Sequence, residues 1–270
     1  MAENSIKQLE SIASNRILRI IVGAIVLISM ILFIPWLYNT WDLETRSYNF
    51  SDFISGVTVT MELYVFALIF GFILGLSLAI ARVYGGGVIS RIATGYIEVI
   101  RGTPVVTQII IIAFLPMMLN AIIAPEGPPI FPVSWDVRYM LSTACLGMNS
   151  AAYQAEFFRG SITSISSGQM LAATSLGMSK RQSIRHIILP QSLRRVIPAW
   201  SNEASYLPKV TTAAYIVGVP EVFAWAKGAA GQGFKSMQVY IFVAVFFIVL
   251  ITVVTWLLDY LYDRAKIPGV

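Results

Sequence analysis

Residues 56–83 read GVTVTMELYVFALIFGFILGLSLAIARV and contain only two charged side chains, Glu62 and Arg82. A helix crosses the hydrocarbon core of a bilayer with about 20 predominantly apolar residues, so this run is long enough to span a membrane. Gly71 and Gly75 stand in a G-x-x-x-G spacing, which lets another helix approach closely. The run therefore predicts a transmembrane helix that packs tightly against a second helix.

The composition supports the same prediction for the whole chain. Of its 270 residues, 57% are apolar and 12% are charged, which is about half the charged fraction of a soluble domain. A soluble protein of this length needs more charged side chains to build its surface. The single cysteine, Cys145, excludes an internal disulfide and is expected to be a small buried apolar residue. The chain is thus predicted to be an integral membrane protein, embedded in the lipid bilayer.

Six apolar stretches are each long enough to be a membrane span. Besides residues 56–83, they are residues 17–38, 96–123, 140–158, 190–219 and 239–262. The first follows a polar segment that carries Lys and Arg, and no small-residue cleavage pattern follows it, so it is expected to be retained as an anchor. The fold class predicted from this pattern is an all-α polytopic membrane protein.

Lysine and arginine residues are distributed unevenly between the two sides of these spans. If the N-terminus is cytoplasmic, fourteen of the 19 lie on the cytoplasmic side and Lys209 lies within a span, which leaves four outside: Arg46, Arg138, Lys227 and Lys235. Because cytoplasmic loops carry the excess of these residues, both termini are expected in the cytoplasm. The net charge of +5 is explained by cations beside anionic lipid and predicts no nucleic-acid partner.

About thirty polar residues separate the fourth predicted span from the fifth. Ser166 or Ser167 can cap a short helix there, and Gly177 can end that helix in the left-handed conformation. Ser179, followed three residues later by Gln182, forms a capping-box pattern for a second helix. Because a simple connection between two spans needs only a few residues, we predict that this helical corner is a docking surface for a cytoplasmic partner.

The same stretch resembles a known family signature. Six of its residues match the cytoplasmic loop motif of ATP-binding-cassette importer permeases, E-A-A-x3-G-x9-I-x-L-P: Ala172, Ala173, Gly177, Ile187, Leu189 and Pro190. Three further segments resemble the polar amino acid uptake group within that family: RGTP at 101–104 followed by Gln108, YQAEFFRG at 153–160, and IVGVPE at 216–221. The resemblance covers about residues 56–264.

The resemblance implies a type I ABC importer permease fold with five core spans. Residues 1–40 would be an N-terminal cytoplasmic segment with an additional span, and residues 41–270 would be the permease core. The cytoplasmic loop, about residues 160–189, would couple the permease to ATP-binding cassette ATPase subunits. The location implied is the plasma (inner) membrane of a prokaryote.

Further partners follow from the same resemblance. They are a second permease subunit, identical or sibling, an extracellular or periplasmic solute-binding protein, and an amino acid substrate. ATP and Mg are expected on the ATPase, and no cofactor or metal is expected on this chain. The sequence contains no G-x4-G-K-[ST] phosphate-binding loop, so the chain is not expected to be an enzyme.

Two positions depart from the family pattern. Leu171 stands where the loop motif begins with glutamate, which predicts either an altered contact with the ATPase or a second permease subunit that carries the complete motif. In the fifth span the group usually reads Leu-Lys-Asp followed by Thr or Ser, whereas this chain reads PKVTT over residues 208–212. Val210 therefore replaces the aspartate.

Charged side chains inside the predicted spans are candidates for the substrate site, because a charge at membrane depth costs several kcal/mol and is usually functional. They are Glu62, Glu203 and Lys209. Pro208 has no N–H to donate to the carbonyl of Ala204 and is predicted to break the helix beside Lys209. Lys209 could bind the carboxylate of a zwitterionic amino acid and one glutamate its ammonium. Three uncharged residues are further candidates: Thr211, Thr212 and Gln108.

The sequence leaves alternatives open. Lys209 could pair with Glu203 as a structural contact, although residues six apart on an unbroken helix differ in direction by about 120°. Glu62 could instead extend to the outer interface. At the level of function, the rivals are an ion-coupled secondary transporter that uses Glu62 and Lys209 as a relay, and a membrane scaffold that transports nothing.

Overall fold

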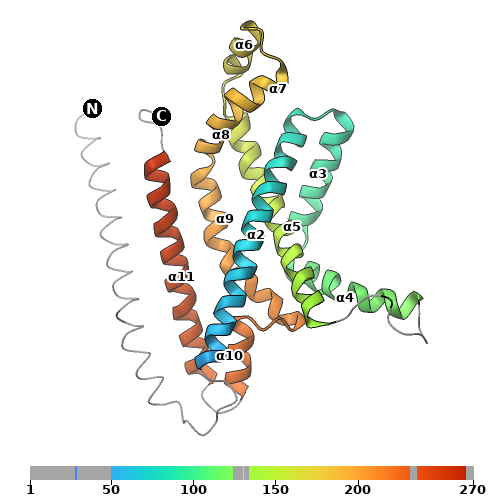
Figure 1. Ribbon diagram of the computed structural model, residues 1–270, viewed down its shortest axis with the longest axis vertical. Helices are drawn as coiled ribbons and strands as arrows, with labels where there is room; N and C mark the ends of the chain where they lie inside the picture. The colour runs from blue at the N-terminus through green and yellow to red at the C-terminus, as the bar shows by residue number, and fades with distance from the viewer. Residues whose placement is uncertain (1–27, 29–49, 124–129, 131–133, 232–235, 266–270) are drawn as a thin grey trace.

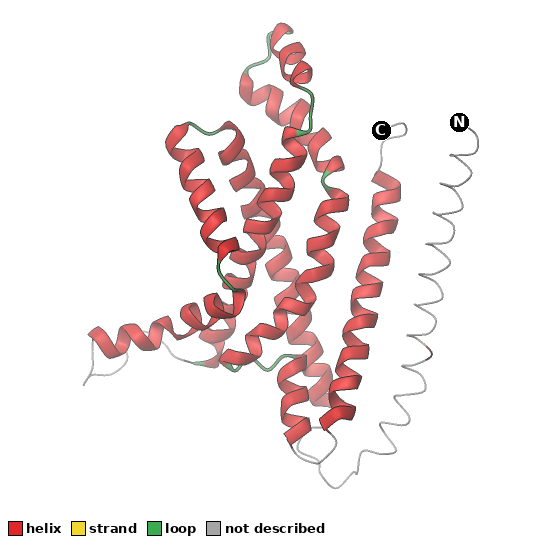
Figure 2. Ribbon diagram, turned by 180° about the vertical axis from the view of Figure 1, so that it is seen from behind, coloured by secondary structure: helices red, strands yellow, loops and turns green. Residues whose placement is uncertain are grey.

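The computed structural model describes residues 28, 50–123, 130, 134–231 and 236–265. The first predicted span, residues 17–38, lies outside this set except for Ile28, so the division of the chain at residue 40 stays a prediction. All regular elements in the described part are helices (Figure 2). Three of these helices are long and apolar enough to cross a membrane, over Ser51–Tyr84, Val105–Ile123 and Ser236–Tyr260.

Two long helices, α2 (Phe50–Tyr84) and α5 (Trp135–Thr163), lie side by side along the length of the molecule (Figure 1). Their close approach depends on the two glycines of α2. A Cβ added to Gly71 would lie 2.5 Å from an atom of the Gln154 side chain, and one added to Gly75 would lie 2.8 Å from the backbone oxygen of Ala151. The G-x-x-x-G spacing therefore packs α2 against another helix, as predicted.

The third predicted span, residues 96–123, is two helices, so the prediction of a single span was wrong. Helix α3 (Gly87–Gly102) packs against α2 and α5. Helix α4 (Val105–Ile123) projects sideways from the bundle, at the end opposite α6 and α7 (Figure 1). Thr103 between them has an extended backbone with φ −115° and ψ 141°. A following proline favours that conformation, and Pro104 has no N–H with which to continue the helix.

Three consecutive helices form the fifth predicted span: α8 (Leu189–Arg195), α9 (Ile197–Val210) and the 3-10 helix η2 (Thr211–Val217). The fourth predicted span lies within α5, and the sixth coincides with α11 (Ser236–Ala265). Helix α11 packs against α9 and α10 (Val222–Gly231), a helix that the sequence did not predict. The N–H of Val222 donates to the Thr60 hydroxyl at 3.1 Å, which joins α10 to α2.

The fifth span does not break at Pro208, contrary to the prediction. Helix α9 continues through this proline and changes to 3-10 geometry only at Thr211. The Thr211 hydroxyl donates to the Pro208 carbonyl at 2.8 Å, and the Thr212 hydroxyl donates to the Lys209 carbonyl at 2.6 Å. These side chains satisfy carbonyl groups at the end of α9, so the chain can change its helical geometry there without exposing unpaired backbone oxygens.

At the other end of the molecule, three short helices project beyond α2 and α9 (Figure 1): α6 (Ser167–Ser175), α7 (Lys180–Ser183) and the π-helix η1 (Ile184–Ile188). They stand where the polar stretch between the fourth and fifth spans was predicted to form a helical corner. A buried apolar cluster lies beneath them and includes Ala79 of α2, Phe158 of α5 and Ile188 of η1. The corner therefore packs against the end of the bundle through this cluster.

Candidate functional site

The first helix of the corner begins and ends as predicted. The Ser166 hydroxyl accepts a hydrogen bond from the N–H of Gly168 at 3.3 Å and caps α6. Gly177 has φ 82°, and the N–H of Met178 donates to the carbonyl of Ala173 at 3.1 Å. Helices that end at a left-handed glycine form this hydrogen bond.

The second helix, α7, begins with the predicted capping box. The N–H of Ser179 donates to Gln182 Oε1 at 2.8 Å, and the N–H of Gln182 donates to the Ser179 hydroxyl at 3.4 Å. The Lys180 ammonium donates to the Tyr84 carbonyl at 3.3 Å and lies 5.7 Å from the centroid of the Tyr84 ring. These contacts hold α7 against the end of α2, so the corner has a defined position relative to the spans.

The seven residues predicted to couple the permease to an ATPase divide into two sets. The exposed set is Leu171, Ala172, Gly177 and Pro190, and Leu171 has 69% of its surface exposed. The other set is buried or half-buried at the base of the corner: Ala173, Ile187 and Leu189. Helix α6 carries no charged side chain, so its exposed face is uncharged, with apolar, hydroxyl and amide side chains, where the family motif would present a carboxylate.

The three charged candidates inside the spans contact different partners. Glu62 accepts a hydrogen bond from the Tyr139 hydroxyl at 2.9 Å, and Glu203, which is buried, accepts one from the Ser150 hydroxyl at 2.8 Å. The Lys209 ammonium lies 5.5 Å from the centroid of the Tyr206 ring. In the part of the chain that the structure describes, Lys209 forms no salt bridge, so it pairs with neither glutamate.

Two of the uncharged candidates make structural contacts. The Gln108 side chain donates to the Thr103 hydroxyl at 2.6 Å and to the Ile100 carbonyl at 2.7 Å, and it accepts from Asn149 of α5 at 3.1 Å. Gln108 thereby holds the connection between α3 and α4 against α5. Thr211 is buried and donates a hydrogen bond to the Pro208 carbonyl of the preceding helix, α9. Direct contact of either residue with a substrate stays a prediction.

Lys209 and Thr212 line a common cavity of about 370 Å³, which is open to the surface because Lys209, Tyr206 and Ile216 are exposed. It lies among the end of α9, helix η2, the first turn of α4 and the first turn of α10, and its other walls include Val105, Tyr206, Val210, Tyr215 and Phe223. Binding sites for small molecules have volumes of about 300–1,000 Å³, so this cavity suits a small solute. Of the six predicted substrate residues, these two are the ones that the structure brings together in it.

A buried chain of hydrogen bonds, which the sequence analysis did not identify, joins α5 to α9. The Trp200 indole N–H donates to Gln154 Oε1 at 2.7 Å, and Gln154 Nε2 donates to the Ser150 hydroxyl at 3.0 Å. The Ser150 hydroxyl donates in turn to Glu203. The signal in the sequence was Ser150 and Gln154, two polar residues one helical turn apart inside an apolar span. Glu203 thus belongs to the contact between two spans.

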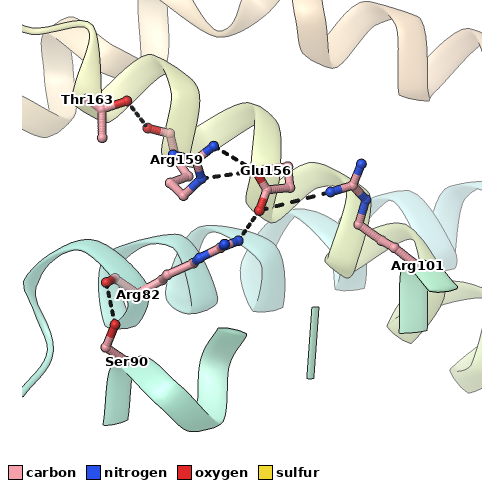
Figure 3. A network of polar contacts seen from close by, with 6 residues as sticks. All are labelled: Arg82, Ser90, Arg101, Glu156, Arg159 and Thr163. Atoms are coloured by element: carbon pink, nitrogen blue, oxygen red, sulfur yellow. Dashed lines mark hydrogen bonds and ion pairs between the residues drawn. The ribbon is translucent and has the colours of Figure 1, made fainter. Parts of the chain in front are cut away.

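A second group missed by the sequence analysis surrounds Glu156 on α5 (Figure 3). Its carboxylate forms a salt bridge with Arg82 of α2 and another with Arg159 at 2.9 Å, and the Arg101 guanidinium of α3 lies 4.0 Å away. The Arg101 guanidinium also lies 5.2 Å from the centroid of the Tyr153 ring. One carboxylate therefore links three helices. The signal was that Glu156 and Arg159 stand one helical turn apart in the sequence.

Between the fifth and sixth spans, the Glu221 carboxylate caps α10. It is fully buried and accepts hydrogen bonds from the N–H groups of Phe223 and Ala224, both at 2.8 Å. Burial raises the pKa of Glu221 to about 7, although these two hydrogen bonds lower it. The carboxylate is directed at the helix terminus and does not line the Lys209 cavity.

Comparisons with known proteins agree with this arrangement. A family model described as a binding-protein-dependent transport system inner membrane component matches residues 67–267. The glutamine transport system permease protein of Escherichia coli (strain K12) is 33% identical over 218 residues, which are 79% of this chain and 93% of that protein. A probable amino-acid permease protein of Bacillus subtilis (strain 168) is 34% identical over 229 residues, which are 84% of this chain and 96% of that protein.

The fold also matches a solved structure. The crystal structure of an amino acid ABC transporter with histidines contains a chain that is 28% identical, with a TM-score of 0.68. The match covers 83% of this chain and 99% of that one. The described helices are therefore arranged as in an ABC transporter permease.

Proposed function

This chain belongs to the family of binding-protein-dependent transport system inner membrane components, and we propose that it imports amino acids in a complex driven by ATP. As a member of the family it is a membrane permease subunit. The amino acid substrate is supported by the relatives, since the Escherichia coli protein is a glutamine permease and one of Bacillus subtilis is an L-cystine permease. The cavity at Lys209, of a size for a small solute, supports the same substrate class.

The observation that carries the proposal is the α6–α7 corner. It projects from one end of the spans (Figure 1), its two helices are capped at Ser166 and Ser179, and Leu171 is exposed on its surface. A projecting pair of capped helices suits docking of a separate ATPase subunit. That subunit would bind ATP and Mg and hydrolyse the nucleotide. Movement of that subunit would reach the spans through Lys180 and the buried cluster at Phe158.

The proposal includes two further partners and an orientation. A second permease subunit would complete the pathway, and a solute-binding protein would deliver the substrate at the end opposite the corner. The corner and both termini would face the cytoplasm. The cationic residues of the corner, Lys180, Arg181 and Arg185, support that orientation, because cytoplasmic segments carry the excess of positive charge.

An ion-coupled carrier with a Glu62–Lys209 relay finds no support in the described contacts, because Glu62 is bonded to Tyr139 and Lys209 lies against Tyr206. The test is uptake of labelled glutamine into vesicles that contain this chain, its ATPase and permease partners, and the solute-binding protein. We expect uptake only with ATP on the ATPase side. Uptake driven by an ion gradient in the absence of the ATPase would contradict the proposal.

A matched pair of variants tests the role of the corner. Leu171→Arg adds a charge to the exposed face of α6 and is expected to reduce uptake about tenfold or more, since a buried unpaired charge at an interface costs several kcal/mol. Ile89→Arg changes an exposed aliphatic residue of α3 and is expected to leave uptake within about twofold of wild type. Equal effects of the two substitutions would show that α6 is not the docking surface.

A further inference from the structure

The Lys209 cavity carries a positive charge and no negative charge among the described residues that line it. Of the residues that line it, Lys209 is charged and the others are aliphatic, aromatic or hydroxylic, in the part of the chain that the structure describes. The Thr212 hydroxyl already donates its proton to the Lys209 carbonyl. Val210, next to Lys209 in the chain, contributes an aliphatic side chain to the wall.

The acidic residues that could balance Lys209 are bonded elsewhere. Glu203 is buried against Ser150, Glu62 accepts from Tyr139, and Glu221 caps α10. None of the three carboxylates lines the cavity. The ammonium of Lys209 is therefore not neutralised by a carboxylate from the described residues.

The cavity wall at α4 adds to this positive potential. Val105 and Val106 are the first two residues of α4 and both line the cavity. The N–H groups in the first turn of a helix have no carbonyl partner within that helix, and the helix dipole places partial positive charge there. The corresponding end of α10 differs, since Glu221 accepts hydrogen bonds from its first turn.

The remaining walls of the cavity are aromatic or aliphatic and include no carboxylate in the described part of the chain. Tyr206, Tyr215 and Phe223 line the cavity, and the rings of Tyr215 and Phe223 lie 5.5 Å apart. An aromatic face attracts a cation, which suits the α-ammonium of an amino acid whose carboxylate is at Lys209. A cationic side chain on the same substrate would lie in a cavity whose fixed charge repels it.

We propose that Lys209 binds the substrate carboxylate and selects by charge, so that this permease carries neutral or acidic amino acids and discriminates against basic ones. This inference rests on the proposed function and names the substrate class of the same site. It assigns to Lys209 the discrimination between side-chain charges, in addition to the binding of a carboxylate common to all amino acids.

The test measures binding to the permease complex without its solute-binding protein, whose own specificity would otherwise mask that of the cavity. The complex of permease and ATPase subunits is placed in lipid nanodiscs, and labelled glutamine, glutamate and arginine are bound at equilibrium. We expect glutamine and glutamate to bind at least about tenfold more tightly than arginine, as like charges in one site cost several kcal/mol. Lys209→Glu is expected to reverse this order, and Lys209→Arg to preserve it.

The matched control is Lys227→Glu, which makes the same charge reversal on an exposed residue of α10 outside the cavity. It is expected to leave the order of the three ligands unchanged. Tighter binding of arginine than of glutamine by the wild-type complex would overturn the inference, as would an order that Lys209→Glu does not alter. Either result leaves ATP-driven uptake intact, whereas loss of the ATP requirement would refute the proposed function itself.

Discussion

The α6–α7 corner and the hydrogen-bonded chain between α5 and α9 are both polar regions of an apolar protein, but they are built differently. In the corner, the bonds that define each helix join residues no more than five positions apart, as in Ser179 with Gln182. In the buried chain, Trp200 and Gln154 are 46 positions apart, and Ser150 and Glu203 are 53 apart. A locally bonded corner can project from the bundle and meet a partner, whereas the buried chain can form only when the spans have packed.

The comparison has a consequence for mutations. A change in the contacts between spans should lower the stability of the whole protein, because each contact joins elements far apart in sequence. A change in the corner should alter coupling to a partner and leave the spans intact. Four substitutions test this difference, and their expected effects on the free energy of unfolding decrease from the α2–α5 contact to the corner.

The largest effect is expected from Gly75→Leu at the contact between α2 and α5. A Cβ at Gly75 would lie 2.8 Å from the Ala151 carbonyl oxygen and 3.0 Å from the Cβ of Gln154. Because the backbone of α5 cannot move aside freely, we expect a loss of about 3 kcal/mol, measured by denaturant unfolding in detergent micelles. Gly95→Leu on α3 is the control, since a Cβ there meets nothing within 4 Å. Equal losses for both variants would contradict the close packing of α2 on α5.

A smaller loss is expected from Glu156→Gln, which leaves the arginines around it without their shared carboxylate (Figure 3). Removing one member of a buried ion pair costs about 3–5 kcal/mol, but these side chains are 17–41% exposed. We therefore expect about 2 kcal/mol in the same unfolding measurement. Adding Arg82→Gln to this variant should recover part of the loss. A further loss in the double variant would show that Arg82 has another partner.

Ser150→Ala removes the central member of the buried chain. The serine donates to Glu203 and accepts from Gln154, and hydrogen bonds between membrane helices are worth about 0.6 kcal/mol on average. With two bonds lost we expect a decrease of about 1 kcal/mol. Ser77→Ala provides the control, because Ser77 is exposed and donates only to the Ile73 carbonyl of its own helix. If the two serines give the same result, the chain between α5 and α9 does not contribute to stability.

The smallest effect on the spans is expected from Gly177→Ala in the corner. The alanine would have to adopt φ 82°, at a local cost of about 1–2 kcal/mol, while global unfolding should change by less than about 0.5 kcal/mol. ATP-driven uptake should nevertheless fall several-fold. Gly168→Ala within α6 is the control, as its φ is not positive. A global loss as large as that of Ser150→Ala would show that the corner and the spans unfold as one unit.

The membrane spans were predictable to different degrees. Residues 56–83 gave a correct span because hydropathy along one helix is a local property, and α2 indeed includes them. Residues 96–123 did not give a correct span, because a proline inside an apolar run is compatible either with one kinked helix or with two helices. The contact of Gln108 with Thr103 and Asn149 favours two. The bond between Gln108 and Asn149 joins α4 to α5, and no pattern along the chain specifies it.

The candidate site shows the same limit. Charge within apolar spans identified Glu62, Glu203 and Lys209 as unusual, but it did not specify how they would pair. Ser150 and Tyr139 provide the partners of the two glutamates, from α5. The residues that shape the α6–α7 corner were easier to identify, since helix capping and left-handed glycines depend on a few neighbouring positions. The docking role of the corner and the roles of the substrate candidates stay predictions.

The sequence by itself determined that this protein is an all-helical membrane permease with a capped helical corner, because hydropathy, capping residues and the loop motif are properties of short segments. Tertiary structure alone decided that the intramembrane glutamates are bonded to α5 and that Lys209 is left as the charged residue of a cavity. That outcome depends on which helix faces meet, and helices distant in the chain can meet in many ways. The close approach of α2 to α5 at Gly71 and Gly75 selects one of them.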